Sequence, residues 1–191
     1  MSENYYHTKA SVAEYIELAK DVNGAGLISK LRQYLNPGAM LLELGSGPGT
    51  DYQLLSKGYK VTGSDNSNEF LEHLITRHPD GQFLKLNAAT LATEKHFDGI
   101  YSNKVLHHLT NEELSASVKR QADILHEGGT ICHSFWKGEG DELFKGLYVN
   151  YHNEAALKQF FEGQFEIMLV ESYAEFEEGD SLLLLASKKN S

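Results

Sequence analysis

The chain has 191 residues, 41% of them hydrophobic and 23% charged, which predicts one soluble globular domain spanning residues 1–191. The formal net charge of −10, with lysines and arginines spread thinly, makes nucleic acid an unfavourable partner. Cys132 is the only cysteine, which excludes an intramolecular disulfide and a zinc–thiolate cluster, and no other metal site is expected. No apolar run reaches membrane length and the N-terminus lacks a signal-like pattern, so the expected location is cytoplasmic.

Helical and strand patterns alternate along the sequence, which favours an α/β fold. Two helical segments, 8–21 and 25–34, are expected before Pro37. The expected strands are residues 40–45, 59–64, 82–86, 97–102, 130–136, 165–171 and 181–186. The expected helices between them are residues 50–57, 67–78, 111–126 and 153–161. A capping box of Thr110 and Glu113 opens the third of these helices, and Asn66 with Glu69 is a candidate cap for the second.

The last two expected strands are joined by residues 174–180, which leave no room for a crossover helix. These two strands must therefore pair antiparallel. The sequence predicts a doubly wound, mostly parallel sheet of seven strands, with helices on both faces and a C-terminal antiparallel hairpin.

The most informative segment runs Met-Leu-Leu-Glu-Leu-Gly-Ser-Gly-Pro-Gly-Thr over residues 40–50. An apolar strand is followed by Gly45, Gly47 and Gly49, which let the backbone turn and approach a ligand. The GxGxG spacing differs from the GxGxxG loop that holds a pyrophosphate. Glu43 is costly in a buried strand unless a ligand requires it, and a positively charged ligand meets that requirement.

Further polar residues follow the next strands, where an open α/β sheet binds its ligands. Asp65 and Asn66 end the second strand, and Asp65 lies 20 residues beyond Gly45, an offset that suits a carboxylate accepting both ribose hydroxyls. An aspartate at this point is also a common turn former. Asn87 and Ala88 follow the third strand, either as a ligand contact or as a plain turn.

The fourth strand is followed by the phrase Phe-Asp-Gly-Ile-Tyr-Ser-Asn-Lys-Val-Leu-His-His-Leu, residues 97–109. This phrase and the acid–apolar–GxGxG segment resemble motifs of the class I S-adenosylmethionine (SAM)-dependent methyltransferases. The glycine pair at Gly128 and Gly129 and the terminal hairpin agree with that resemblance. It covers residues 40–136 in ordered motifs and the C-terminal part more loosely.

The resemblance implies SAM as cofactor and S-adenosylhomocysteine as product. It places the glycine loop, including Ser46, near the methionine part of SAM, with Glu43 at the ammonium. It places Asn87 and Ala88 at the adenine, although the family often has Asp at the first of these positions. Ser102 and Asn103 would border the methionine and sulfonium end.

In the family, an N-terminal piece like residues 1–37 often folds over the cofactor as a lid, and here Tyr15 or Tyr6 would reach SAM. A plain packing helix is the alternative.

Methyl transfer from a sulfonium needs a general base only if the acceptor must lose a proton. His107 and His108 are the candidates, but adjacent helical residues face different ways, so at most one would reach the acceptor. The alternative is that both simply pack in the turn.

The aromatic segment 137–152 is the expected cover of the acceptor side. The acidic turn at residues 174–180 would favour a neutral or cationic small molecule, partly through cation–π contact. A solvated acidic loop is the alternative.

The sequence thus predicts a SAM-dependent methyltransferase acting on a small molecule, as a monomer or homodimer. Three other functions stay open: a nicotinamide-dependent oxidoreductase, a non-catalytic SAM-binding or protein-interaction module, and an RNA or protein methyltransferase of the same fold.

Overall fold

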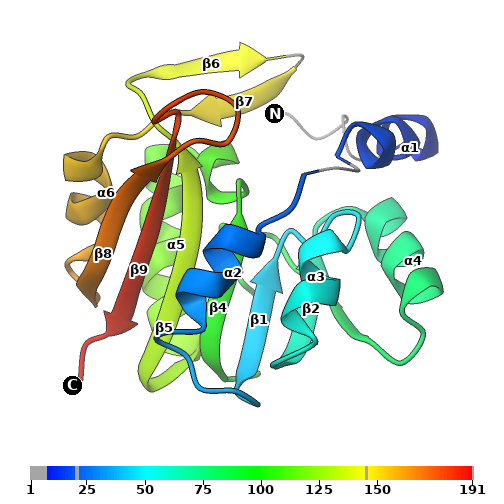
Figure 1. The fold of residues 1–191 in the computed structure, drawn as a ribbon, viewed down its shortest axis with the longest axis horizontal. Coiled ribbons are helices and arrows are strands. Elements are labelled where there is room, and N and C mark those ends of the chain that lie inside the picture. The colour runs from blue at the N-terminus through cyan, green and yellow to red at the C-terminus, as the bar shows by residue number, and fades with distance from the viewer. Residues whose placement is uncertain (1–7, 20–21, 145, 191) are drawn as a thin grey trace.

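The computed structural model describes residues 8–19, 22–144 and 146–190. A seven-stranded sheet of order β3-β2-β1-β4-β5-β9-β8 forms its centre (Figure 1). The strands are β1 Met40–Leu44, β2 Lys60–Asp65, β3 Gln82–Lys85, β4 Phe97–Asn103, β5 Leu125–Trp136, β8 Phe165–Tyr173 and β9 Ser181–Lys188. The first five pair in parallel, and β9 pairs antiparallel with both β5 and β8. The predicted fold class and terminal hairpin are therefore confirmed.

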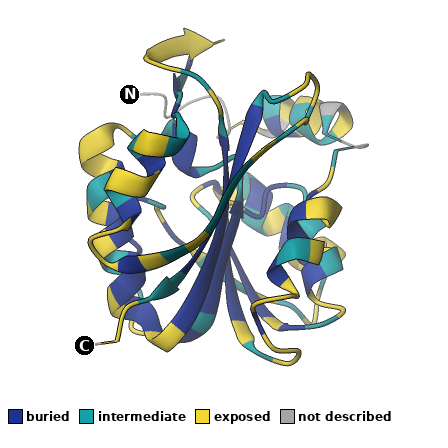
Figure 2. Cartoon of the chain, turned by 60° about the vertical axis from the view of Figure 1, so that its left-hand side comes forward, coloured by how far each residue is buried: buried dark blue, intermediate teal, exposed yellow. Residues whose placement is uncertain are grey.

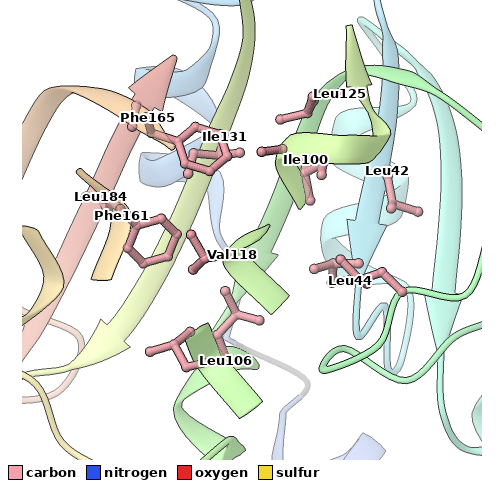
Figure 3. Packing of buried hydrophobic residues seen from close by; sticks show 14 of the residues in the cluster. Leu42, Leu44, Ile100, Leu106, Val118, Leu125, Ile131, Phe161, Phe165 and Leu184 are labelled. Atoms are coloured by element: carbon pink, nitrogen blue, oxygen red, sulfur yellow. The ribbon is translucent and has the colours of Figure 1, made fainter. Parts of the chain in front are cut away.

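Helices cover both faces of the sheet and bury a core on each (Figure 2). They are α1 Lys9–Leu18, α2 Ala25–Leu31, α3 Thr50–Leu55, α4 Asn68–Arg77, α5 Asn111–Ile124, α6 Glu154–Phe161 and the short 3-10 helix η1 Leu106–His108. Side chains alternate along each strand, so Leu41 joins the buried cluster with α2 and α3. Leu42 joins the other cluster, with α5 and α6 (Figure 3). None of the helices in the described residues has the length and apolar content needed to cross a membrane.

Local capping signals decide where the helices begin. The predicted capping box is present, because Thr110 Oγ1 accepts from the Glu113 backbone N–H and the Glu113 carboxylate accepts from the Thr110 N–H. The predicted cap of α4 by Asn66 is wrong. Ser67 is the N-cap, and its hydroxyl accepts from the backbone N–H of Phe70 at 3.2 Å.

Two strand features differ from expectation. The fifth strand begins at Leu125 rather than Thr130, since Leu125 pairs with Phe97 across a register shift. Residues 137–152 also contain an unexpected hairpin of β6 Asp141–Phe144 and β7 Leu147–Asn150. Its turn includes Gly146 at a φ of 81°, a conformation that favours glycine. The aromatic segment expected to cover the site is therefore held as a separate two-stranded sheet.

A chain of buried polar side chains joins β4, β5 and α5 within the core. Ser102 Oγ lies 2.8 Å from His133 Nδ1, and His133 Nε2 lies 2.8 Å from Gln121 Oε1. The Gln121 amide donates to Ser117 Oγ, which donates to the Ala88 carbonyl. Because the Gln121 carbonyl oxygen only accepts, His133 carries its proton on Nε2 and accepts from Ser102. The network thus holds His133 as a neutral imidazole.

Acid is expected to destabilise the protein through His133. Burial lowers the pKa of His133 from 6.5 to about 3, so between these values the unfolded chain binds a proton that the native state does not. The contribution of His133 to the free energy of unfolding therefore falls as pH falls, by about 1.3 kcal/mol between pH ~7 and ~5.5. Urea unfolding of the wild type and of a His133 variant at the two pH values isolates this contribution, because Glu43 acts in the opposite direction. His133→Gln should remove this change in the free energy of unfolding between the two pH values, and the exposed control His96→Gln should not. If the free energy of unfolding depended equally on pH in both variants, the assignment would be refuted.

Candidate functional site

A cavity of about 440 Å³ lies at the carboxyl ends of the central strands. Its walls come from the glycine loop after β1, the end of β4, η1, the end of β5, the β6–β7 hairpin and the turn between β8 and β9. Residues before α2 close another side. Strand order brings these segments together, because β1, β4, β5 and β9 are consecutive neighbours in the sheet. The cavity therefore lies where ligands bind in open α/β sheets.

Glu43 presents a buried carboxyl group to this cavity. Strand alternation turns it to the α3 face, where it is 2% exposed, and Ser46 Oγ donates to its Oε2 at 2.6 Å. Burial raises the pKa of Glu43 from 4.5 to about 8; the Ser46 hydrogen bond opposes the rise, and Asp51 and Asp65 add to it. Without a ligand the carboxyl holds its proton at neutral pH. A bound cation would favour the carboxylate.

The glycine loop has the backbone conformation that its sequence demands. Gly45, Gly47 and Gly49 have φ values of 63°, 47° and 84°, in the left-handed region that favours glycine. A Cβ on Gly45 would lie 2.6 Å from a methyl carbon of Val105. Gly45 and Ser46 line the cavity, whereas Gly47 donates its backbone N–H to Asp65 at 3.0 Å. The backbone at Gly45 and Ser46 is thus the part of the loop that a ligand in the cavity can approach closely.

Asp51 is a cavity residue that the sequence interpretation missed. Its Oδ1 accepts from the Gly24 backbone N–H at 2.6 Å. Its Oδ2 accepts from the Tyr101 hydroxyl at 2.7 Å and from Asn103 Nδ2 at 3.1 Å. Asp51 therefore ties the segment before α2 to the end of β4. Its only sequence signal was an acid in the first turn of a helix, which is common without any function.

The predicted ribose and adenine residues lie outside the walls of this cavity. Asp65 ends β2 as predicted, but its two oxygens accept from the backbone N–H groups of Gly47 and Ser67. Asn66 is exposed. Asn87 is exposed and its Oδ1 accepts from the Ala89 N–H at 2.7 Å, so its side chain forms the turn that was the alternative reading. Ala88 follows it, partly buried.

Ser102 and Asn103, the predicted polar pair at the end of β4, point to opposite faces of the sheet because side chains alternate along a strand. Ser102 is fully buried and bonded to His133, so the structure turns it into the core and away from the cavity. Asn103 lines the cavity, donating to Asp51 and accepting from the Ser134 hydroxyl at 2.6 Å. Of the two, Asn103 is the residue placed to meet a ligand.

The N-terminal residues contribute in two ways. Tyr15 of α1 lines the cavity, and its ring packs edge-on against Phe70 with centroids 5.8 Å apart. Helix α1 lies beyond the carboxyl ends of β1 and β2 (Figure 1), whereas α2 buries Leu27, Ile28 and Leu31 against the sheet. Within the expected lid, α1 thus borders the cavity and α2 is a packing helix. Tyr6 lies outside the described residues.

His107 and His108 both line the cavity, with ring centroids 4.0 Å apart. His108 Nδ1 lies 2.7 Å from the Tyr148 carbonyl oxygen and therefore carries a proton that it donates. His107 is 3% exposed, and its Nδ1 has no hydrogen-bond partner among the described residues. Burial lowers the pKa of both rings, that of His107 well below its usual range. Both imidazoles are therefore neutral near pH 7.

The acidic turn expected to form an open rim is largely paired within the protein. Asp180 accepts from the backbone N–H groups of Glu175, Phe176 and Glu177 at 2.8–3.0 Å. Glu175 also pairs with Lys104, a cavity residue that carried no sequence signal. These internal contacts remove much of the support for a cationic acceptor.

Comparison with known proteins matches residues 41–129 to the family described as "Methyltransferase domain". The trans-aconitate 2-methyltransferase of Agrobacterium fabrum is 32% identical over 116 residues, 59% of this chain and 43% of that protein. An uncharacterized methyltransferase of Oceanobacillus iheyensis is 29% identical over 140 residues, 70% of this chain and 61% of that protein. The chain thus spans about half the length of these curated relatives.

A solved structure with the same fold is the Burkholderia thailandensis 1,6-didemethyltoxoflavin-N1-methyltransferase, bound to 1,6-didemethyltoxoflavin and S-adenosylhomocysteine. It superposes with a TM-score of 0.76 at 20% identity, covering 95% of this chain and 87% of that one. The family match over residues 41–129 and the ordered motifs of residues 40–136 thus show similarity to methyltransferase domains, and the whole chain shares the fold of that S-adenosylhomocysteine-bound methyltransferase.

Proposed function

We propose that the chain binds SAM in this cavity and transfers its methyl group to a small-molecule acceptor by in-line displacement. One observation carries the proposal. Around the glycine loop the cavity presents two carboxyl groups, Glu43 and Asp51, and no basic side chain among the described residues lining that part. SAM has an ammonium and no phosphate, whereas a phosphate-binding loop supplies a lysine.

Glu43 is the proposed partner of the SAM ammonium, held by Ser46. Asp51 and Asn103 extend the same polar wall, and Tyr15 covers it from α1. The remaining proposed contacts are the backbone of Gly47 and Gly49, Asp65 and Asn66 at the ribose, Asn87 and Ala88 at the adenine, and Ser102 at the sulfonium end. Of these, Ser102 and Asn87 have the least support, because their side chains are bonded elsewhere.

The reaction requires little covalent chemistry from the protein. The sulfonium methyl is already activated, so acceleration comes chiefly from holding the acceptor close, aligned and dry. An acceptor that must lose a proton would give it to a neutral imidazole in the wall, and we assign this role to His107 in preference to His108. His107 is favoured because it lies beside Lys104, whose charge acts on it. In His108 the Nδ1 proton is donated to Tyr148, so only Nε2 of that ring can accept a proton.

A small acceptor is favoured by the size of the cavity and by the hairpin at residues 141–150 that covers its far side. The similar Burkholderia enzyme was solved with a small molecule bound. Lys104 in the wall favours a neutral acceptor over a cationic one. The cytoplasmic location and the monomeric or homodimeric state stay predictions.

Thermal unfolding with SAM, S-adenosylhomocysteine or NAD tests the cofactor. A ligand at one hundred times its dissociation constant stabilises the native state by about 2.7 kcal/mol. For a domain of this size the midpoint should rise by roughly 5–11 °C with SAM and its product, and not with NAD. A shift with NAD alone would support an oxidoreductase instead. SAM binding without turnover of any small molecule, nucleic acid or protein would support a non-catalytic module.

A further inference from the structure

Lys104 places an ammonium group in the cavity wall. Its Nζ lies 3.5 Å from the ring centroid of Trp136 and 5.3 Å from that of Tyr173. It donates to Ser181 Oγ at 2.6 Å and pairs with Glu175 Oε2 at 3.4 Å. The side chain is only 13% exposed. Because the Glu175 contact is long, an oxygen or nitrogen lone pair on a ligand can compete for that N–H.

The same charge argues against a cation as the acceptor. The Trp136 face that would have attracted a cation is covered by the Lys104 ammonium itself. Burial lowers the pKa of Lys104 to about 8, although Glu175 and Asp180 oppose the change, so the group is mostly charged near pH 7. A second cation placed beside it would be repelled.

His107 lies near Lys104 in the same wall. Burial is the main reason for its lowered pKa, and the nearby His108, Lys104 and His152 lower it further. His107 lines the cavity, and a neutral imidazole there can accept a proton from a bound ligand. A proton acceptor and a positive charge therefore face one cavity.

We propose that the acceptor is a planar conjugated molecule whose nucleophilic atom carries an acidic N–H or O–H, such as a phenol or a ring imide, with Lys104 as the residue that selects it. This inference rests on the proposed methyl transfer. The exposed aromatic rings of Phe144 and Phe176 in the walls suit a flat molecule.

The reaction balances without any further reagent. The N–H or O–H bond of the acceptor breaks, and its proton passes to the imidazole of His107. The lone pair left on that atom attacks the SAM methyl carbon, and the carbon–sulfur bond breaks with its electron pair moving to sulfur. The products are the methylated acceptor and S-adenosylhomocysteine, and His107 then loses the proton to solvent. Lys104 stabilises the negative charge spread over the acceptor before attack.

The test uses 4-nitrophenol, uracil and benzylamine as probes of similar size. Their binding to the protein loaded with S-adenosylhomocysteine, and their turnover with SAM, are measured for the wild type, Lys104→Met, Lys104→Arg and the exposed control Lys137→Met. The phenol or the imide should bind and be methylated in preference to the amine. Lys104→Met should weaken that binding by about 10- to 100-fold, the value of a charge-assisted hydrogen bond, and Lys104→Arg should restore part of it. Lys137→Met should behave as the wild type.

A merely structural Lys104 would change all three probes alike. Preference for benzylamine, or failure of both acidic probes to bind while S-adenosylhomocysteine binds, would overturn the proposed acceptor class and leave the cofactor assignment intact. Failure to bind S-adenosylhomocysteine would instead refute the proposed function.

Discussion

Replacing Glu43 with Gln is expected to abolish the proton release that accompanies SAM binding near neutral pH. The pKa of Glu43 in the free protein is about 8, because the carboxyl is buried, so about nine-tenths of the molecules hold the proton at pH ~7. The SAM ammonium favours the carboxylate, so binding expels the proton. Calorimetry in two buffers of different ionisation enthalpy should give close to one proton released per SAM in the wild type and close to none in the variant.

The same substitution should weaken SAM binding by about 10- to 100-fold, because a charge-assisted hydrogen bond becomes a neutral one. Glu127→Gln is the matched control, since Glu127 is 59% exposed and lies near the start of β5, away from the cavity. Equal proton release in wild type and Glu43→Gln would show that another group meets the ammonium.

A second measurement on Glu43 needs no ligand. The unfolded carboxyl titrates near 4.5 and the native one near 8, so between these values the native state holds the extra proton. The free energy of unfolding should therefore fall as pH rises through this window, by about 1.4 kcal/mol per pH unit for this group. Glu43→Gln removes that loss. An unchanged pH dependence would mean that Glu43 is ionised in the free protein.

Gly24→Ala should destabilise the protein and weaken SAM binding, whereas Gly26→Ala should not. A Cβ on Gly24 would meet the Tyr101 hydroxyl at 2.1 Å and Asp51 Oδ2 at 2.5 Å. The backbone at Gly24 has φ −86° and ψ 24°, which alanine can adopt, so the effect is steric. Overpacking of this kind costs about 1–3 kcal/mol. It also displaces Asp51, which borders the part of the cavity that we propose holds SAM.

The control lies two residues away on α2. A Cβ on Gly26 meets nothing within 4 Å, and alanine in a helix is favoured over glycine by roughly 0.5–1 kcal/mol. The midpoint of urea unfolding should therefore fall for Gly24→Ala and rise for Gly26→Ala. The SAM-induced thermal shift should shrink only for Gly24→Ala. If both variants kept the wild-type shift, Asp51 would have no part in cofactor binding.

Local patterns were enough to predict most of the fold. Strand periodicity, the capping box at Thr110 and the length of the 174–180 connection fixed the element order and the antiparallel hairpin. Local patterns failed to predict element boundaries that depend on residues distant in the sequence. The cap of α4 went to Ser67 instead of Asn66, and β5 extended to Leu125 because β4 offers a partner there.

For the site, the sequence by itself indicated the glycine loop, Glu43, His107, His108 and Asn103, because each belongs to a motif or an element end, and Tyr15 was one of two tyrosines that the family resemblance offered. Only the tertiary structure decided the rest. Asp51 meets residues 27 and 50 positions away, and Lys104 meets one 77 positions away. Strand alternation buried Ser102 against His133 and left Asn103 in the cavity. A motif records which residues occur together along the chain. Packing of strands that are distant in sequence decides which side chains share a cavity and what charge they carry there.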